Sequence, residues 1–262
     1  MSKVKTIILK EWAEVFKNRR VLLTTAFLPL FFTALPLTIL YVGQGAGGVG
    51  APADMPAQFA GFCPAGVSGD ECLQVFFVSQ FMILFMMLPM IIPVNIAAYS
   101  IVGEKTGRSL EPLLATPITT AELLIGKNLA AAVPAMIATW LGFGIYALGA
   151  ALLVRSPVAF AALFDATWLL GVFVVGPLLA VLSVNFSLMV SSRVNEPRVA
   201  EQISALVILP VMALFVGQVA GVLFISRGLI LVLAVVLAVL DAGLVRLTVR
   251  LFQRETILTR WK

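Results

Sequence analysis

The chain has 262 residues, of which 61% are hydrophobic and only 12% are charged, and its mean hydropathy is +1.06. A soluble domain carries about 25% charged residues, so this chain has too few charges to cover a water-exposed surface. We therefore expect lipid to be its main solvent, and membrane topology explains the net charge of +5 better than nucleic-acid binding does. Histidine is absent and there are only two cysteines, which excludes the usual zinc, haem and Ser-His-Asp arrangements. The sequence predicts no catalytic residue and no metal site.

The N-terminal segment, residues 1–20, is predicted to contain an amphipathic helix over residues 3–17. Two sets of residues recur at helical spacing on opposite faces: apolar Val4, Ile8, Trp12 and Val15, and polar Lys3, Lys10, Glu14 and Lys17. A basic amphipathic helix that precedes a membrane span usually lies in the lipid headgroup layer. The simpler interpretation is a positively charged anchor, and the two are compatible.

Six later segments are long and apolar enough to cross a bilayer as helices, which takes about 20 residues each. They are residues 21–43, 75–102, 128–154, 166–190, 203–225 and 228–247. Helices are favoured over barrel strands because these segments are apolar all round and a helix satisfies its own backbone hydrogen bonds. The predicted fold class is an all-α integral membrane protein in which residues 1–262 form a single transmembrane domain.

The basic residues predict the orientation of these spans. Of the 18 Lys and Arg residues, all except Arg155 and Arg227 fall on one side of the predicted membrane. The positive-inside rule makes this richer side cytoplasmic. Both termini are therefore expected to be cytoplasmic.

The segment 44–74 follows the first span and is expected to be an external loop. It is rich in Gly and Pro, lacks Lys and Arg, and contains both cysteines, Cys63 and Cys72. An oxidising external compartment would allow them to form a disulfide. The alternative is two free thiols.

The segment 103–127, between the second and third spans, mixes charged and apolar residues in a way that a solvated linker does not need. Leu110, Leu113 and Leu114 fall on one face of a helical turn and would form a small apolar knob. A helical knob with an exposed apolar face is suited to docking on a protein partner.

The chain is expected to break after this knob, because the residue before Pro117 disfavours the helical region. Thr119 and Glu122 then form a capping-box pattern that predicts a new helix leading into the third span. The segment is thus predicted to form a short helix, then a break, and then the start of a new helix.

Four uncharged polar residues within the spans are candidates for a substrate pathway: Gln80, Asn95, Asn185 and Gln218. Polar residues are costly in lipid and often face a bundle interior, although hydrogen bonds between helices are the commoner use of Asn and Gln. Asp241 is the single acidic residue deep in a span. We expect it to form an ion pair with Arg246 or another basic residue rather than a cation or proton site.

Gly217 and Gly221 form a GxxxG pattern that would pack helices closely, although the pattern is weak in a segment rich in small residues. Several prolines interrupt the spans and are expected to kink them. They are Pro29, Pro36, Pro89, Pro93, Pro134, Pro177 and Pro210.

Three stretches of the sequence resemble a known signature. They are Ile-Val-Gly-Glu-Lys at 101–105, Arg-Ser-Leu-Glu-Pro-Leu-Leu-Ala-Thr-Pro at 108–117 and Glu-Leu-Leu-Ile-Gly-Lys at 122–127. Together they resemble type-2 ABC transporter permeases, and the sodium-efflux or multidrug branch most of all. The layout is also similar: a basic amphipathic start, six spans and an external loop after the first span.

The resemblance implies a permease subunit of an ATP-driven exporter in the cytoplasmic membrane of a prokaryote. Such a subunit works with a second permease, identical or different, and with a pair of cytoplasmic ATPase subunits that bind ATP and Mg. The sequence agrees, because it contains no GxxxxGK[ST] phosphate loop of its own. Membrane lipid would be a further partner and nucleic acid would not.

The resemblance also implies where the ATPase docks. The loop after the second span would be the coupling helix, which moves with the ATPase and switches the spans between inward-open and outward-open states. Its expected contact residues are Glu104, Lys105, Arg108, Leu110, Glu111, Leu113 and Leu114. A smaller second contact would come from the next cytoplasmic loop through Arg193, Asn195, Glu196 and Arg198.

One feature departs from the family. Several members have re-entrant helices between spans five and six, whereas only Ser226 and Arg227 separate these spans here. The external loop at 44–74 would then cover the outer mouth instead. The alternative to an ABC permease is a self-sufficient secondary transporter or channel, which should show internal repeats and more buried charge.

Overall fold

The computed structural model describes residues 3–17, 19–45, 69–107, 118–154, 156–223 and 225–252. All regular structure in these ranges is helical. The elements are α1 (Lys3–Lys17), α2 (Arg19–Gly45), α3 (Gly69–Thr106), α5 (Thr120–Leu153), α6 (Pro157–Leu163), α7 (Ala166–Leu170), the π-helix η3 (Gly171–Val175), α8 (Gly176–Arg193), α9 (Pro197–Ser204), the 3₁₀-helix η4 (Ala205–Ile208), α10 (Leu209–Val219) and α11 (Arg227–Leu251).

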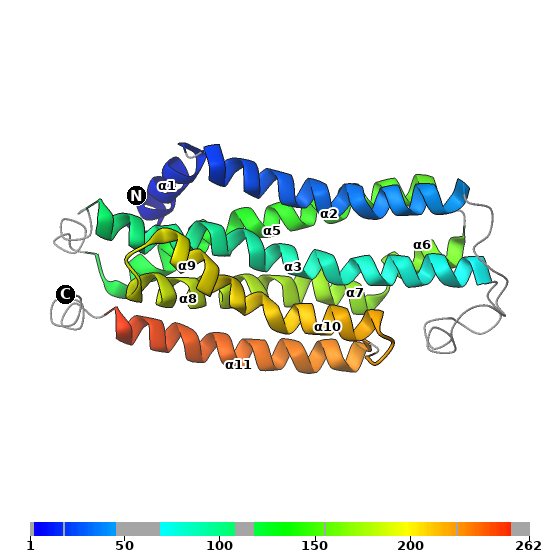
Figure 1. The fold of residues 1–262 in the computed structure, drawn as a ribbon. Helices are drawn as coiled ribbons and strands as arrows, with labels where there is room; N and C mark the ends of the chain where they lie inside the picture. Colours follow the sequence, from blue (N-terminus) through cyan, green and yellow to red (C-terminus); the bar gives the residue numbers. More distant parts are fainter. Residues whose placement is uncertain are drawn as a thin grey trace.

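The prediction of an all-α membrane protein with six spans is confirmed. Six helical stretches are long and apolar enough to cross a membrane: α2, α3, α5, the run from α6 to α8, the run from α9 to α10, and α11. They lie side by side as an elongated bundle (Figure 1). Helix α1, the last turns of α3, α8 and α11, and the first turn of α5 all lie at one end of this bundle, which we call the α1 end.

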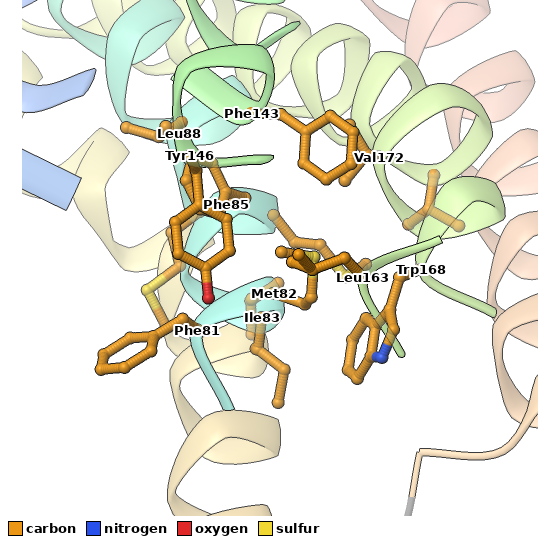
Figure 2. Close-up of a cluster of buried hydrophobic side chains, with 14 of the residues drawn as sticks. Phe81, Met82, Ile83, Phe85, Leu88, Phe143, Tyr146, Leu163, Trp168 and Val172 are labelled. Atoms are coloured by element: carbon orange, nitrogen blue, oxygen red, sulfur yellow. The ribbon is translucent and has the colours of Figure 1, made fainter. Parts of the chain in front are cut away.

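Helix α3 forms the centre of the bundle and packs against α2, α5, α6, α8, α9 and α10. At its middle, Phe85 meets Phe143 edge to face at 6.3 Å between ring centroids, and Tyr146 at 5.2 Å. Figure 2 shows these rings in one buried cluster that also includes Met82 and Trp168. Because lipid tails are as apolar as these side chains, close van der Waals packing rather than escape from water holds this core together.

The fourth and fifth spans each change their helical winding shortly before a proline. The π-helical turn η3 precedes Pro177, and the 3₁₀ turn η4 precedes Pro210. A proline cannot donate its backbone N–H and its ring clashes with the carbonyl four residues earlier. A local change of winding relieves this clash without breaking the helix.

Helix α10 ends in a Schellman motif, which corrects the interpretation of Gly217 and Gly221 as a packing pattern. Gly221 has φ 69°, its N–H donates to the Gln218 carbonyl at 3.0 Å, and the Val222 N–H donates to the Gly217 carbonyl at 2.9 Å. A Cβ on Gly217 would lie 2.7 Å from Leu223, in the chain that folds back over it. These glycines terminate the helix, which therefore ends before residue 225.

Gly221→Ala is expected to destabilise the protein by about 1–2 kcal/mol, because an L side chain disfavours the left-handed conformation. Gly243→Ala is the matched control. A Cβ at Gly243, inside α11, would meet nothing within 4 Å, and alanine is the better helix former there. Thermal unfolding in detergent should show a lower midpoint for the first variant and an unchanged or higher one for the second. Equal shifts would contradict the terminating role of Gly221.

The end opposite α1 carries the short helix α6, which begins the run that forms the fourth span and lies before the predicted start of that span at residue 166. Ser156 caps its N-terminus and donates to the Glu71 carboxylate on α3 at 3.0 Å. Helix α3 begins at Gly69, inside the segment that was expected to be an external loop. Between α10 and α11 the described residues form a turn without a re-entrant helix, as the short spacing in the sequence indicated.

Candidate functional site

A charged cluster is buried at the α1 end, where three helices meet. The Lys127 ammonium on α5 lies 2.7 Å from the Glu11 carboxylate on α1 and 3.0 Å from the Glu104 carboxylate on α3. Lys10 on α1 donates to the same Glu104 oxygen at 2.8 Å. The side chain of Lys127 is only 1% exposed, so this ammonium is fully withdrawn from solvent. We call Lys10, Glu11, Glu104 and Lys127 the charge cluster.

A serine completes the charge cluster. Lys127 donates to the Ser100 hydroxyl at 2.7 Å, and this hydroxyl donates to the second Glu11 oxygen at 3.0 Å. Two ammonium and two carboxylate groups balance in charge. Buried ions need both an opposite charge and hydrogen bonds to offset the loss of water, and this arrangement provides both for Lys127 and Glu11.

Lys10, which is partly exposed, lies on the solvent side of the charge cluster. Burial alone lowers the pKa of its ammonium, but the hydrogen bond and the negative charge of Glu104, together with Glu14 and Glu11, raise the pKa above its ordinary value. Lys10 therefore stays charged over the physiological pH range. It acts as a second cation for Glu104.

Close contact between α1 and α5 holds the charge cluster together. Ile7 packs directly on Gly126, and the Trp12 indole N–H donates to the Ala130 carbonyl at 3.0 Å. The glycine beside Lys127 thus allows α1 to approach α5 closely enough for Glu11 to reach the ammonium. The predicted apolar face of α1 flanks this contact, whereas Ile7 and Glu11 are the residues that are buried.

Gly126→Ala is expected to cost about 1–3 kcal/mol, because its Cβ would lie 2.7 and 2.9 Å from Ile7 Cγ2 and Cβ, which are fixed to the α1 backbone. Gly149→Ala, in the same helix, is the control. Its Cβ would lie 2.6 and 2.7 Å from the two terminal methyl groups of Leu37 and 3.2 Å from Leu37 Cγ, and the end of this side chain can rotate away. The unfolding midpoint in detergent should fall clearly only for Gly126→Ala. A larger fall for Gly149→Ala would overturn this account of the α1–α5 contact.

The end of α3 is also joined to the end of α8. The Ser191 hydroxyl is fully buried, donates to the Ala98 carbonyl at 2.8 Å and accepts from the Val102 N–H at 3.1 Å. Lys105 donates to the Ser192 carbonyl at 2.6 Å, just before the connection to α9. Helix α3 therefore has fixed contacts with α1, α5 and α8 within its last two turns.

The predicted partner-contact residues occupy different environments. Glu104 is 4% exposed inside the charge cluster, and Lys105 is half-buried against α8. In the connection between α8 and α9 and the first turn of α9, the side chains are exposed at Arg193, Asn195, Glu196 and Arg198. Outside the described residues lie Arg108, Leu110, Glu111, Leu113 and Leu114.

The new helix that was predicted to start after the break at Pro117 is confirmed. The Thr119 hydroxyl accepts from the Glu122 N–H at 3.2 Å, and the Glu122 carboxylate accepts from the Thr119 N–H at 2.8 Å. This capping box starts α5. Residues 108–117 thus follow the end of α3, which holds Glu104 of the charge cluster, and precede the capped start of α5.

The pathway candidates lie deeper in the bundle. Asn185 on α8 is buried, accepts from the Asn128 amide of α5 at 3.0 Å and donates to the Val181 carbonyl at 2.9 Å. Asn95 is half-buried on α3. Gln80 and Gln218 are buried, and their amide oxygens have no hydrogen-bond partner.

The ion pair predicted between Asp241 and Arg246 is not formed. Asp241 is buried, and both of its carboxylate oxygens lack a hydrogen-bond partner, whereas Arg246 is exposed. Residues five apart point to different sides of a helix, whereas residues three or four apart are neighbours. In the predicted disulfide, Cys72 is buried in the first turns of α3 and Cys63 lies outside the described residues, so the pairing stays a prediction.

The sequence alone did not identify three members of this end of the bundle: Glu11, Ser100 and Asn128. The sequence held one signal of a buried charge: the acidic residue Glu11 lies on the same stripe of the helix as the apolar Ile7. Its partners come from residues about 90 to 115 positions away, which no local pattern can pair.

Comparison with known proteins identifies the family. Residues 5–226 match the family model described as ABC-2 family transporter protein. A protein of Stutzerimonas stutzeri, described as "Probable ABC transporter permease protein NosY", is 28% identical over 197 residues, which cover 75% of this chain. The match spans 62% of the length of that relative. The chain, a multi-pass membrane protein, belongs to the ABC-2 transporter family.

Proposed function

We propose that the chain is the permease subunit of an ATP-driven ABC exporter and couples to a separate ATPase subunit through its α1 end. The observation that carries this proposal is the charge cluster beside the segment between Gly107 and Ile118, in a chain whose family is that of ABC transporter permeases. ATP and Mg would be bound by the partner ATPase, and this chain would contribute no catalytic residue. A second permease copy or relative would complete the pathway.

The charge cluster supports a mechanical role. The segment 108–117 joins α3 to α5, and the cluster ties the adjoining ends of these helices to each other and to α1. A displacement of the segment by a partner would then move three helices together rather than bend one loop. Movement of α3 would be passed directly to α2, α5, α6, α8, α9 and α10, because α3 packs against all of them. This is the property that alternating access requires of a coupling element.

Two of the expected contact residues are better suited to positioning the segment than to touching the ATPase. Glu104 is enclosed by Lys10 and Lys127, and Lys105 is directed to the α8 carbonyls. The direct contacts would come from Arg108, Leu110, Glu111, Leu113 and Leu114. The exposed residues at the end of α8 and just after it, led by Arg193 and Glu196, would form the smaller second contact.

Helix α1 is suited to lie at the cytoplasmic surface of the membrane. Its buried face holds the charge cluster, while Leu9 and Phe16 are exposed and Lys5 and Lys17 are exposed beside them. Apolar side chains flanked by lysines match the boundary between acyl chains and anionic headgroups. With the positive-inside rule, this orients the α1 end toward the cytoplasm of a prokaryotic cell.

Purification of the tagged chain from its native membranes in mild detergent tests the proposal. We expect an ATPase subunit to co-purify in equal amounts, and the reconstituted complex to hydrolyse ATP. If the chain purifies alone and its vesicles move a solute along an ion gradient without ATP, the secondary-transporter alternative replaces the proposal.

A further inference from the structure

A single carboxyl group is buried in the seam between α11 and the rest of the bundle. The buried residues of α11 are Ile230, Leu237, Asp241 and Thr248, which form one stripe along the helix. Asp241 is 6% exposed and lies near the middle of this span. Neither of its oxygens has a hydrogen-bond partner.

The charged groups of the surrounding elements do not neutralise Asp241. Helix α11 packs mainly on α8, η3 and α7, with a smaller contact to α5. In α8, η3 and α7 the sole charged residue is Arg193, which is exposed at the last position of α8. In α5 the charged residues are Glu122, which caps the helix, and Lys127, which belongs to the charge cluster.

The basic residues of α11 itself do not reach Asp241 either. Arg227 begins the helix at the opposite end of the bundle, and Arg246 and Arg250 are exposed near the α1 end. In the described part of the chain, Asp241 takes part in no salt bridge. No charged group among the described residues therefore pairs with this carboxyl.

Energetics decide which form of the carboxyl fits this seam. An unpaired ionised aspartate in the middle of a span is costly, and more so where no water can follow it. A neutral carboxylic acid carries only the smaller penalty of an unsatisfied polar group. A metal cation would need several oxygen ligands, and the described residues contain no group of three or more acidic, His or Cys side chains.

We propose that Asp241 is a proton-binding site, whose carboxyl is protonated while the seam between α8 and α11 is closed. The carboxyl loses its proton when water reaches it, so a conformation in which this seam is open releases a proton. Opening is then favoured as pH rises and closure as pH falls. The proposal does not depend on the ATPase partner, so its failure and the failure of the proposed function are separable.

A hydrophobic carbodiimide tests this directly, because it adds covalently to protonated carboxyl groups in apolar surroundings. The reagent would be applied to membranes that contain the full chain, and the labelled peptide would be identified by mass spectrometry. We expect label on Asp241 at mildly acidic pH, decreasing as pH rises, and no label in Asp241→Asn. Glu11 and Glu104 are built-in controls, since they are equally buried but held in salt bridges with Lys127 and should therefore stay unlabelled.

Three results would overturn the proposal. They are the absence of label on Asp241 at every pH, label on Glu11 and Glu104 to the same extent, and loss of label when sodium is added at constant pH. The last result would assign the site to a metal cation instead. As a second measurement, the infrared carbonyl band of a protonated carboxylic acid should be present in the native protein and lost in Asp241→Asn, whose side chain has the same shape.

Discussion

Lys127→Met is expected to destabilise the protein by about 3–5 kcal/mol, the range found when one partner of a buried ion pair is removed. Methionine fills a similar volume but leaves Glu11 buried without a cation. The measurement is the unfolding midpoint in detergent together with the amount of protein in the membrane. Both should fall strongly.

Lys10→Met is the control for this prediction. Its side chain is 38% exposed, and Glu104 would keep Lys127 as its partner. Partly exposed ion pairs contribute at most about 1 kcal/mol, so the midpoint should change little. An equal fall of the unfolding midpoint in Lys127→Met and Lys10→Met would show that the importance of Lys127 does not come from the burial of its charge.

Neutralising the whole buried set separates stability from coupling. In the triple variant Lys127→Met, Glu11→Gln and Glu104→Gln, no unpaired buried charge remains, so we expect a large part of the lost stability to return. Transport should nevertheless stay impaired, because the ends of α1, α3 and α5 are no longer held together by charge. ATP hydrolysis that continues without transport in this variant would support the positioning role of the charge cluster. Full recovery of transport would refute it.

The spans and the start of α5 could be predicted because their signals are local. Apolar runs of sufficient length give the spans, and the Thr119–Glu122 spacing gives the capping box of α5. Both are properties of adjacent residues and do not require knowledge of the packing. The same holds for the family signature at 101–127, which the family match supports.

The charge cluster could not be predicted, because its members are joined only by the packing of α1 on α5. In the sequence Lys10 and Glu14 look like one exposed face, whereas Glu11, one residue along, is the buried acid. The rotation of α1 about its axis decides which residue is buried, and close contact between Ile7 and Gly126 sets that rotation. The spacing of hydrophobic residues alone does not fix this rotation to within one residue.

The incorrect predictions come from patterns with two physical meanings. Small residues four apart suit both helix packing and a helix terminus, and the positive φ of Gly221 selects the second. Asp241 and Arg246 are close in sequence, but the helical rotation separates them. In both cases the three-dimensional path of the chain, rather than the residue types, determines the outcome.

Leu113→Asp combined with Leu114→Asp is expected to release the ATPase from the permease. If each leucine contributes about 1.4 kcal/mol to the interface, the double change lowers affinity by roughly 100-fold. The ratio of ATPase to permease after purification from native membranes measures this loss. Transport should disappear with it.

The control is Leu9→Asp, which makes the same chemical change at an exposed leucine of the same end of the bundle. It should leave the ATPase bound, because the proposal places the exposed face of α1 against lipid rather than against the partner. If Leu9→Asp releases the ATPase equally well, a general electrostatic effect at the membrane surface replaces specific docking.

The leucine variants should lose binding of the ATPase but keep their stability, whereas the Lys127 variant should lose stability. This contrast distinguishes a docking role from a positioning role. Helices α3 and α5, which the segment 108–117 joins, end and begin in contacts of their own, so we expect the bundle to stay folded when the apolar residues of the segment are changed. The leucine variants should therefore lose the partner at an unchanged unfolding midpoint, whereas Lys127→Met should lower the midpoint. A bundle that unfolds when the leucines are changed would mean that they pack inside the permease, and the docking surface would then have to be sought among the exposed residues after α8.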